Sequence, residues 1–302
     1  MRYNKISATL TNYINKNCTA TTQSKMQYLE KVRLFSKWVY TTEGTERVAP
    51  ERTHDLIQQY IYERTYQGKS AQTVNKDLAS LCAGTGEKKT DYQHPKRNEA
   101  PTKGRSGPGI RTESGARIYD IAPAIGIRED EYRQLKGNGI KEKDGFVYVY
   151  VPKGKGGKEQ WQLVSPDRAN DVRGLFCGKG KDEYIFSKKE IHGIDHSNLH
   201  AFRREHAREM YEWYLERTPE EKNYWMREMK SRFMENPQKR SSWSKVEYRI
   251  KNSPNIVTRG HNKSALISQG RDITFDREAV MFVSVFCLSH YREDVTVTNY
   301  LV

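Results

Sequence analysis

Residues 146–164, FVYVYVPKGKGGKEQWQLV, decide the fold class, because they contain the clearest strand pattern in a chain that otherwise favours helices. Valines alternate with aromatic residues in FVYVYV, a spacing that is typical of a β-strand with two different faces. The glycine- and lysine-rich stretch KGKGGKE predicts a turn, and QWQLV predicts the partner strand. We therefore expect a mainly α protein with a small β-sheet, an α+β fold, in which this hairpin has a basic tip.

The first hundred residues are expected to form helices. One helix is predicted to begin at Ser24, a second after Pro50 and a third at Ser70. Each has apolar residues at three- and four-residue spacing, which gives a helix one buried face. These apolar residues are Leu29, Val32, Phe35, Trp38 and Val39 in the first helix, Leu56, Ile57, Tyr60 and Ile61 in the second, and Val74, Leu78 and Leu81 in the third.

Residues 83–117 are rich in Gly, Pro and Lys and almost free of aliphatic residues, which is typical of an exposed linker. The length of 302 residues fits two domains, and we place them at 1–105, with the basic linker at its end, and 106–302. After the linker, helix is expected near Arg117 and again from His200 onward. The sequence GTGEKKT at 84–90 lacks the spacing of a phosphate-binding P-loop, so we do not expect nucleotide hydrolysis.

Charge and composition restrict the possible partners. Lys and Arg number 52 and Asp and Glu 38, a net charge of +14, which favours a polyanion such as nucleic acid. No apolar run is long enough for a membrane span, and the N-terminus lacks the pattern of a signal peptide. The sequence thus predicts a soluble, cytoplasmic protein. No disulfide framework or zinc finger is expected, because the four cysteines are scattered: Cys18, Cys82, Cys177 and Cys287.

A metal site was considered at His192, His196 and His200, which are four residues apart. On one continuous helix they would share a face. Gly193 and the polar stretch 195–198 instead favour a loop followed by a helix cap, and no acidic or cysteine ligand lies beside them. We therefore expect no bound metal.

Four other motifs follow one another along the chain. AIGIR at 124–128 leads into Glu131, and GKGGKE at 154–159 places a lysine between glycines. HAFR at 200–203 is a His-x-x-Arg pattern, and LSHYREDVTVTNYL at 288–301 places a histidine ten residues before a tyrosine. Each pattern alone is weak, but their order is specific.

In these motifs the sequence resembles the tyrosine recombinase (phage integrase) family. GIREDE resembles the family's first-arginine box, GKGGKE its lysine hairpin, HAFRREHA its His-x-x-Arg box, and LSHYREDVTVTNYL its second-histidine and tyrosine box. The resemblance implies a helical core-binding DNA-binding domain followed by a mixed α/β catalytic domain. It implies an active site made of Arg128, Lys155, His200, Arg203, His290 and Tyr300.

The chemistry that the resemblance implies suits these residue types. Arginines bind the non-bridging oxygens of a phosphodiester, and Tyr300 attacks to form a 3′-phosphotyrosine. A free phenol has a pKa near 10 and needs a proton acceptor, for which we expect His200. Lys155 would protonate the leaving 5′ oxygen, although Lys153 or Lys158 could take that role. His290 would hydrogen-bond the phosphate. No metal, ATP or other cofactor is required.

The resemblance further implies a site-specific recombinase that integrates, excises or resolves a mobile element. The expected partners are double-stranded DNA at core recombination sites, three further copies in a homo-tetramer, and a directionality factor. Alternatives are a type IB topoisomerase-like enzyme, or a DNA-binding regulator without catalysis.

The sequence departs from the family pattern at its C-terminal box. Ser289 replaces the usual glycine before the histidine, and the His290–Tyr300 spacing is one residue longer than is common. Only two residues follow Tyr300, so tetramer contacts are expected elsewhere, conceivably in 208–251.

Overall fold

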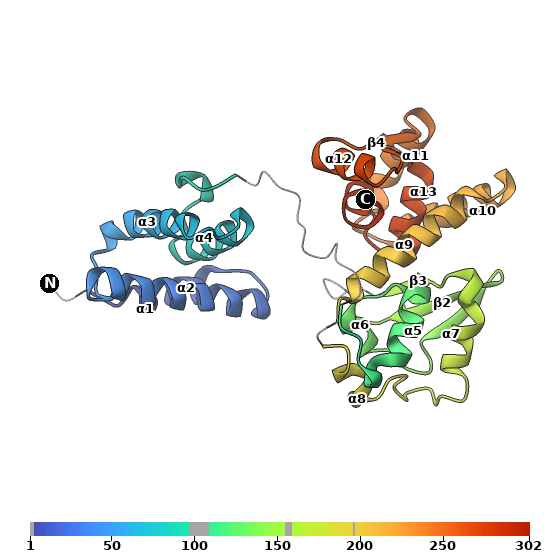
Figure 1. Cartoon of the computed structure of the whole chain (residues 1–302), viewed down its shortest axis with the longest axis horizontal. Helices are drawn as coiled ribbons and strands as arrows, with labels where there is room; N and C mark the ends of the chain where they lie inside the picture. The colour runs from blue at the N-terminus through green and yellow to red at the C-terminus, as the bar shows by residue number, and fades with distance from the viewer. Residues whose placement is uncertain (1–2, 97–108, 155–158, 196) are drawn as a thin grey trace. The chain divides into compact units, whose positions relative to one another are not determined.

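The computed structural model describes residues 3–96, 109–154, 159–195 and 197–302. The chain divides into two compact units, Met1–Glu99 and Ala100–Val302 (Figure 1). No helix in the described part of the chain is long and apolar enough to span a membrane.

The first unit is built from four helices. They are α1 (Ile6–Asn17), α2 (Thr22–Glu43), α3 (Thr53–Tyr66) and α4 (Ala71–Thr85). Their apolar faces form one core, which contains the residues expected from the helical spacing. α2 begins two residues earlier than predicted, because the hydroxyl of Thr21 accepts a hydrogen bond from the backbone N–H of Ser24 and caps the helix. α1 was not predicted from the sequence, because its buried face consists of only three apolar residues.

The prediction of an exposed linker over 83–117 is wrong for its first part. α4 continues to Thr85, and a 3₁₀ turn follows at η2 (Lys89–Asp91). Tyr92 is buried against His54, with 4.4 Å between the ring centroids. The side-chain amide of Asn75 donates to the carbonyl of Pro95 at 2.8 Å. The buried ring of Tyr92 and hydrogen bonds with α3 and α4 therefore hold this polar stretch against the helices.

The predicted hairpin is confirmed, and a further strand precedes it. β1 (Ile140–Lys143), β2 (Phe146–Val151) and β3 (Gln160–Leu163) form an antiparallel sheet in the order β1-β2-β3. Across β2 and β3, Tyr148 pairs with Leu163 and Tyr150 with Trp161. The fold is thus mainly α with a small sheet, as the sequence predicted.

The two faces of this sheet pack against different helices. The valines of β2 lie in one core with α5 (Ala116–Ile125) and α7 (Ala169–Phe176). Tyr148 and Leu163 lie in a second core with α10 (Pro219–Glu235) and the C-terminal helices. α9 (Leu199–Leu215) contributes to both, because Phe202 belongs to the first core and Met210 to the second. A helix shared by both cores is a rigid support for side chains at its N-terminal end.

The remaining elements of the second unit contribute to these cores or connect the elements that do (Figure 1). The predicted helical stretch after Arg117 is two helices, because Gly126 ends α5 in the left-handed conformation. The 208–251 stretch contains the end of α9, then α10 and α11, and Trp225, Met229 and Phe233 bury it in the second core. The other elements are α6 (Glu129–Tyr132), α8 (Lys188–His192), α11 (Trp243–Asn252), β4 (Asn255–Val257), α12 (Gly260–Ser268), β5 (Thr274–Asp276), α13 (Arg277–Phe282), the π-helical turn η6 (Val283–Cys287), α14 (Glu293–Thr296) and the π-helical turn η7 (Val297–Leu301).

A buried carboxylate connects three helices of the first unit. Asp77 of α4, 1% exposed, pairs with Lys31 of α2 at 3.5 Å and with Arg64 of α3 at 3.0 Å. We expect Asp77→Ala to lower the stability of this unit by about 3 kcal/mol, because two cations lose their partner. Hydrogen exchange of the α4 amides in the full chain measures the loss. The exposed Asp55→Ala is the control, and equal effects of both substitutions would contradict the prediction.

Candidate active site

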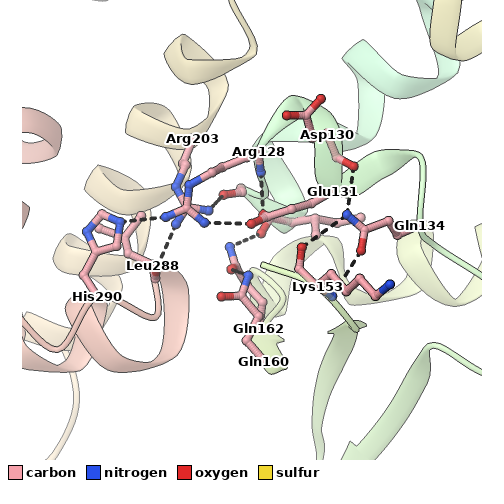
Figure 2. A network of polar contacts seen from close by, with 12 residues as sticks. Arg128, Asp130, Glu131, Gln134, Lys153, Gln160, Gln162, Arg203, Leu288 and His290 are labelled. Atoms are coloured by element: carbon pink, nitrogen blue, oxygen red, sulfur yellow. Dashed lines mark hydrogen bonds and ion pairs between the residues drawn. The ribbon is translucent and has the colours of Figure 1, made fainter. Parts of the chain in front are cut away.

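Arg128 is fixed by a carboxylate on the next helical turn. It lies just after the Gly126 turn, at the start of α6. Glu131, 2% exposed, accepts hydrogen bonds from the backbone N–H and from Nη1 of Arg128, both at 2.7 Å. The other terminal nitrogen, Nη2, is 2.9 Å from Nε2 of His290 (Figure 2). Arginine only donates, so Nε2 of His290 is the acceptor. Glu131 therefore orients Arg128.

Arg203 is completely buried and connects two loops. Its Nη2 donates to the carbonyl of Leu288 at 2.8 Å, and its Nη1 donates to the carbonyl of Gly126 (Figure 2). Gly126 has φ +62°, and a Cβ there would lie 2.3 Å from the ring of His206. Glycine is therefore required for both the backbone conformation and the close approach. Arg203 thus holds the segments of Arg128 and His290 beside α9.

Two histidine rings flank the ring of Tyr300. The ring centroids of His200 and Tyr300 are 5.1 Å apart, and those of His290 and Tyr300 are 5.3 Å apart. The guanidinium carbon of Arg203 is 5.7 Å from the centroid of the Tyr300 ring. His200 and Arg203 share a face of α9 because they are three residues apart. Tyr300, 4% exposed, is therefore surrounded by proton acceptors and positive charge.

The surroundings of His200 favour its neutral form. Burial of the ring and then the positive charges of Arg203, Arg204 and Arg128 lower the pKa of His200 to about 4. As a whole, His200 is nevertheless an exposed residue. A neutral imidazole beside a phenol can accept its proton at pH 7.

The tight turn before Tyr300 depends on Ser284, which the sequence analysis missed. The carbonyl of Ser284 accepts from the backbone N–H of His290 at 2.8 Å, and its hydroxyl accepts from that of Arg292 at 2.8 Å. Ser289 and Tyr291 adopt φ of +52° and +56°, a region where non-glycine residues are strained. The backbone at Ser289 has a left-handed conformation that glycine adopts without strain.

The chain end that carries Tyr300 is held by arginines outside the motifs. Arg271 donates to the carbonyl of Leu301 at 2.6 Å, and Arg208 donates to that of Val302 at 2.8 Å. Glu293, at the start of α14, accepts from both Arg249 of α11 and Arg277 of α13. The 208–251 stretch therefore anchors the helix before Tyr300. No local sequence pattern predicts these contacts, because they join segments that are distant in the chain.

Five of the six side chains expected at the site are brought together by the structure: Arg128, His200, Arg203, His290 and Tyr300. Lys155 and its alternative Lys158 lie outside the described residues. Lys153 is exposed, and its backbone N–H and carbonyl are bonded to the side-chain amide of Gln134 (Figure 2). The hairpin is therefore held, at Lys153, by Gln134 in the segment that follows Arg128.

The three histidines considered as metal ligands do not form a site in the described part of the chain. His192 is exposed and contacts Asp195 at 2.7 Å, while His200 lies beside Tyr300. His196 falls outside the described residues. No group of three potential metal ligands occurs among the residues that the structure describes.

The strain at Ser289 can be measured. Because a side chain in the left-handed region costs about 1 kcal/mol, Ser289→Gly is expected to stabilise the second unit by that amount. Ser289→Ala keeps the Cβ and serves as the matched control, with no gain expected. Urea unfolding of the full chain and both variants gives the comparison, and a destabilised glycine variant would show that Ser289 is not strained.

Comparisons with known proteins gave structural similarity only. No family model matches the sequence, and no curated protein matches it. The structure is similar to XerH site-specific recombinase bound to palindromic difH substrate in a post-cleavage complex, with 14% identity, a TM-score of 0.38, and 68% of this chain and 74% of that one covered. The pre-cleavage complex of XerH with difH gives 15% identity and a TM-score of 0.36, over 68% of this chain and 75% of that one. XerA recombinase has 12% identity and a TM-score of 0.23, with 70% of this chain and 85% of that one covered.

Proposed function

We propose that this protein is a site-specific DNA recombinase that cuts and rejoins strands through a 3′-phosphotyrosine, without metal or ATP. The observation that carries the proposal is the gathering of Arg128, Arg203, His200 and His290 around Tyr300. These residues come from separate motifs, and together they provide a nucleophile, a proton acceptor and cations for a phosphate. The net charge of +14 supports DNA as the substrate.

The proposed mechanism follows from the contacts. Arg128 and Arg203 bind the non-bridging oxygens of the phosphodiester and stabilise the charge that develops on them. Neutral His200 accepts the phenolic proton of Tyr300, whose oxygen attacks phosphorus while the bond to the 5′ oxygen breaks. A lysine at the hairpin tip, Lys155 in our assignment, protonates that leaving oxygen. Rejoining reverses these steps, because the phosphotyrosine conserves the phosphodiester bond.

The proposed assembly on DNA goes beyond these residues. We propose that four copies bring two core sites together in the cytoplasm and exchange strands of a mobile element. A directionality factor would choose between integration and excision. Some residues of 208–251 are already buried against the sheet and α14. Contacts between copies would therefore use other surfaces.

Covalent trapping tests the nucleophile. The protein is mixed in EDTA with nicked duplexes that include the junctions of its element, and an adduct resistant to SDS is measured. We expect the adduct to disappear with Tyr300→Phe and to fall about 100-fold or more with Arg203→Ala. Sequencing of the trapped strand identifies the site. An adduct that survives Tyr300→Phe would disprove this nucleophile, whereas site-specific binding without any adduct would favour a DNA-binding regulator.

The pH dependence of cleavage tests His200. Because the pKa of His200 is lowered to about 4, its acceptor form is present throughout pH 5.5–7.5. We expect the single-turnover rate at subsaturating protein to stay level over that range and to fall as the pH approaches 4. Circular dichroism at each pH confirms folding. A rate that halves near pH 6.5 would mean that the proton acceptor has an ordinary histidine pKa.

The pair of Glu131 and Arg128 predicts non-additive effects. We expect Glu131→Gln to slow cleavage about tenfold, because Arg128 loses the buried carboxylate that holds its guanidinium in place. In the Arg128→Ala background the same change should have no further effect. Additive losses in the double variant would contradict a positioning role for Glu131.

A further inference from the structure

A cavity of about 800 Å³ is lined in part by Arg128 and His290. One wall is the β2–β3 hairpin, a second is the end of α10 with the turn after it, and a third is the segment from Ser289 to Val295. The cavity is thus continuous with the proposed phosphate site but is built largely from other residues.

The hairpin wall is aromatic. Tyr150 and Trp161 form a cross-strand pair with 4.9 Å between their ring centroids. They lie on the same sheet face as Tyr148 and Leu163, which are fully covered by the second core. Tyr150 and Trp161 are only half-buried, because they line the cavity. The sheet therefore presents two rings to whatever occupies this space.

Positive charge surrounds these rings. The cations that line the cavity are Arg128, Arg232, Lys239 and Arg292, against the acids Glu159 and Glu235. Lys141 lies with its ammonium 4.1 Å from the centroid of Trp161. Partial burial and the nearby charges of Arg232 and Lys143 lower the pKa of Lys141. Because Arg128 pairs with Glu131 and Arg292 with Asp294, an anion in the cavity would meet Arg232 and Lys239 of its wall, with Lys141 next to Trp161.

Arg232, which lines the cavity, is well placed to receive an anion, and Lys141 lies beside it against the ring of Trp161. Arg232 of α10 lies over the rings of Tyr148 and Phe286, 5.7 and 5.6 Å from their centroids. Among the residues that the structure describes, neither Arg232 nor Lys141 forms an ion pair. A phosphate would supply the missing countercharge, and the aromatic wall suits the base attached to it.

We propose that this cavity binds a DNA nucleotide next to the attacked phosphate, with its phosphate near Arg232 and its base against Tyr150 and Trp161. The inference rests on the proposed function, since Arg128 and His290 line both the cavity and the phosphate site. It adds a base-binding subsite that no motif residue provides. Charge complementarity and this continuity favour a nucleotide over a second copy of the chain.

Binding of two octamers of equal charge tests the subsite without a known recombination site. One probe is fluorescein-labelled dT8, and the other is an octamer of abasic nucleotides with the same label. We expect the full-length protein to bind dT8 about tenfold more tightly at low salt, because only dT8 can stack. Trp161→Ala should remove this preference, and Trp161→Phe, which keeps a ring, should retain most of it.

Two further variants separate charge from stacking. Arg232→Gln is expected to weaken both probes several-fold, because it removes a phosphate contact and no base contact. Tyr184→Ala, which removes an aromatic ring that is 57% exposed elsewhere in the unit, should leave both affinities unchanged. Equal binding of dT8 and the abasic octamer by the wild type would overturn the proposal, and so would a preference that Trp161→Ala leaves intact. Sedimentation that shows weaker self-association of Trp161→Ala would instead identify a second copy as the occupant.

This result and the covalent trap can fail separately. A preference for dT8 that depends on Trp161, without any adduct, would support the subsite and disprove the strand-transfer reaction. An adduct that depends on Tyr300, without such a preference, would support the reaction and overturn the subsite.

Discussion

The buried guanidinium of Arg203 is the constraint on which the site depends. A completely buried charge is costly unless its donors are satisfied, and two of its nitrogens are satisfied by the carbonyls of Gly126 and Leu288. These carbonyls belong to the loops that precede Arg128 and His290. One side chain on α9 therefore forces two distant loops against the same helix end. If either loop changed its conformation, part of the buried charge of Arg203 would lose its partner. The conformations of the two loops are therefore coupled.

The two cores of the second unit make this arrangement rigid. α9 lies between the core on the valine face of the sheet and the core on its aromatic face, and contributes side chains to both. The 208–251 stretch completes the second core through α10, and Arg249 of α11 holds α14 through Glu293. A segment that the sequence suggested for contacts between copies therefore also positions the tyrosine. Packing and ion pairs act on the same short helix.

The segment from α13 to Tyr300 combines this support with strained backbone. It contains two π-helical turns, η6 and η7, and two non-glycine residues with positive φ, Ser289 and Tyr291. Such features cost free energy and persist only where the surroundings hold them. Ser284 provides that support by bonding three consecutive backbone N–H groups after Ser289. The strain is thus located beside the proposed nucleophile.

The sequence by itself determined the fold class, the central hairpin and three of the first unit's helices, because periods of two and of three to four residues are local. It also selected Arg128, Arg203, His200, His290 and Tyr300 through motifs whose order is visible in the chain. Only the tertiary structure decided that Arg203 donates hydrogen bonds to carbonyls 77 and 85 residues away. It also decided that Ser284 and Arg271 hold the segment that carries Tyr300, and that residues 83–96 pack against the helices of the first unit. These contacts use backbone carbonyls and single side chains, which leave no periodic pattern in sequence; they exist only once distant segments are brought together by the burial of apolar surface.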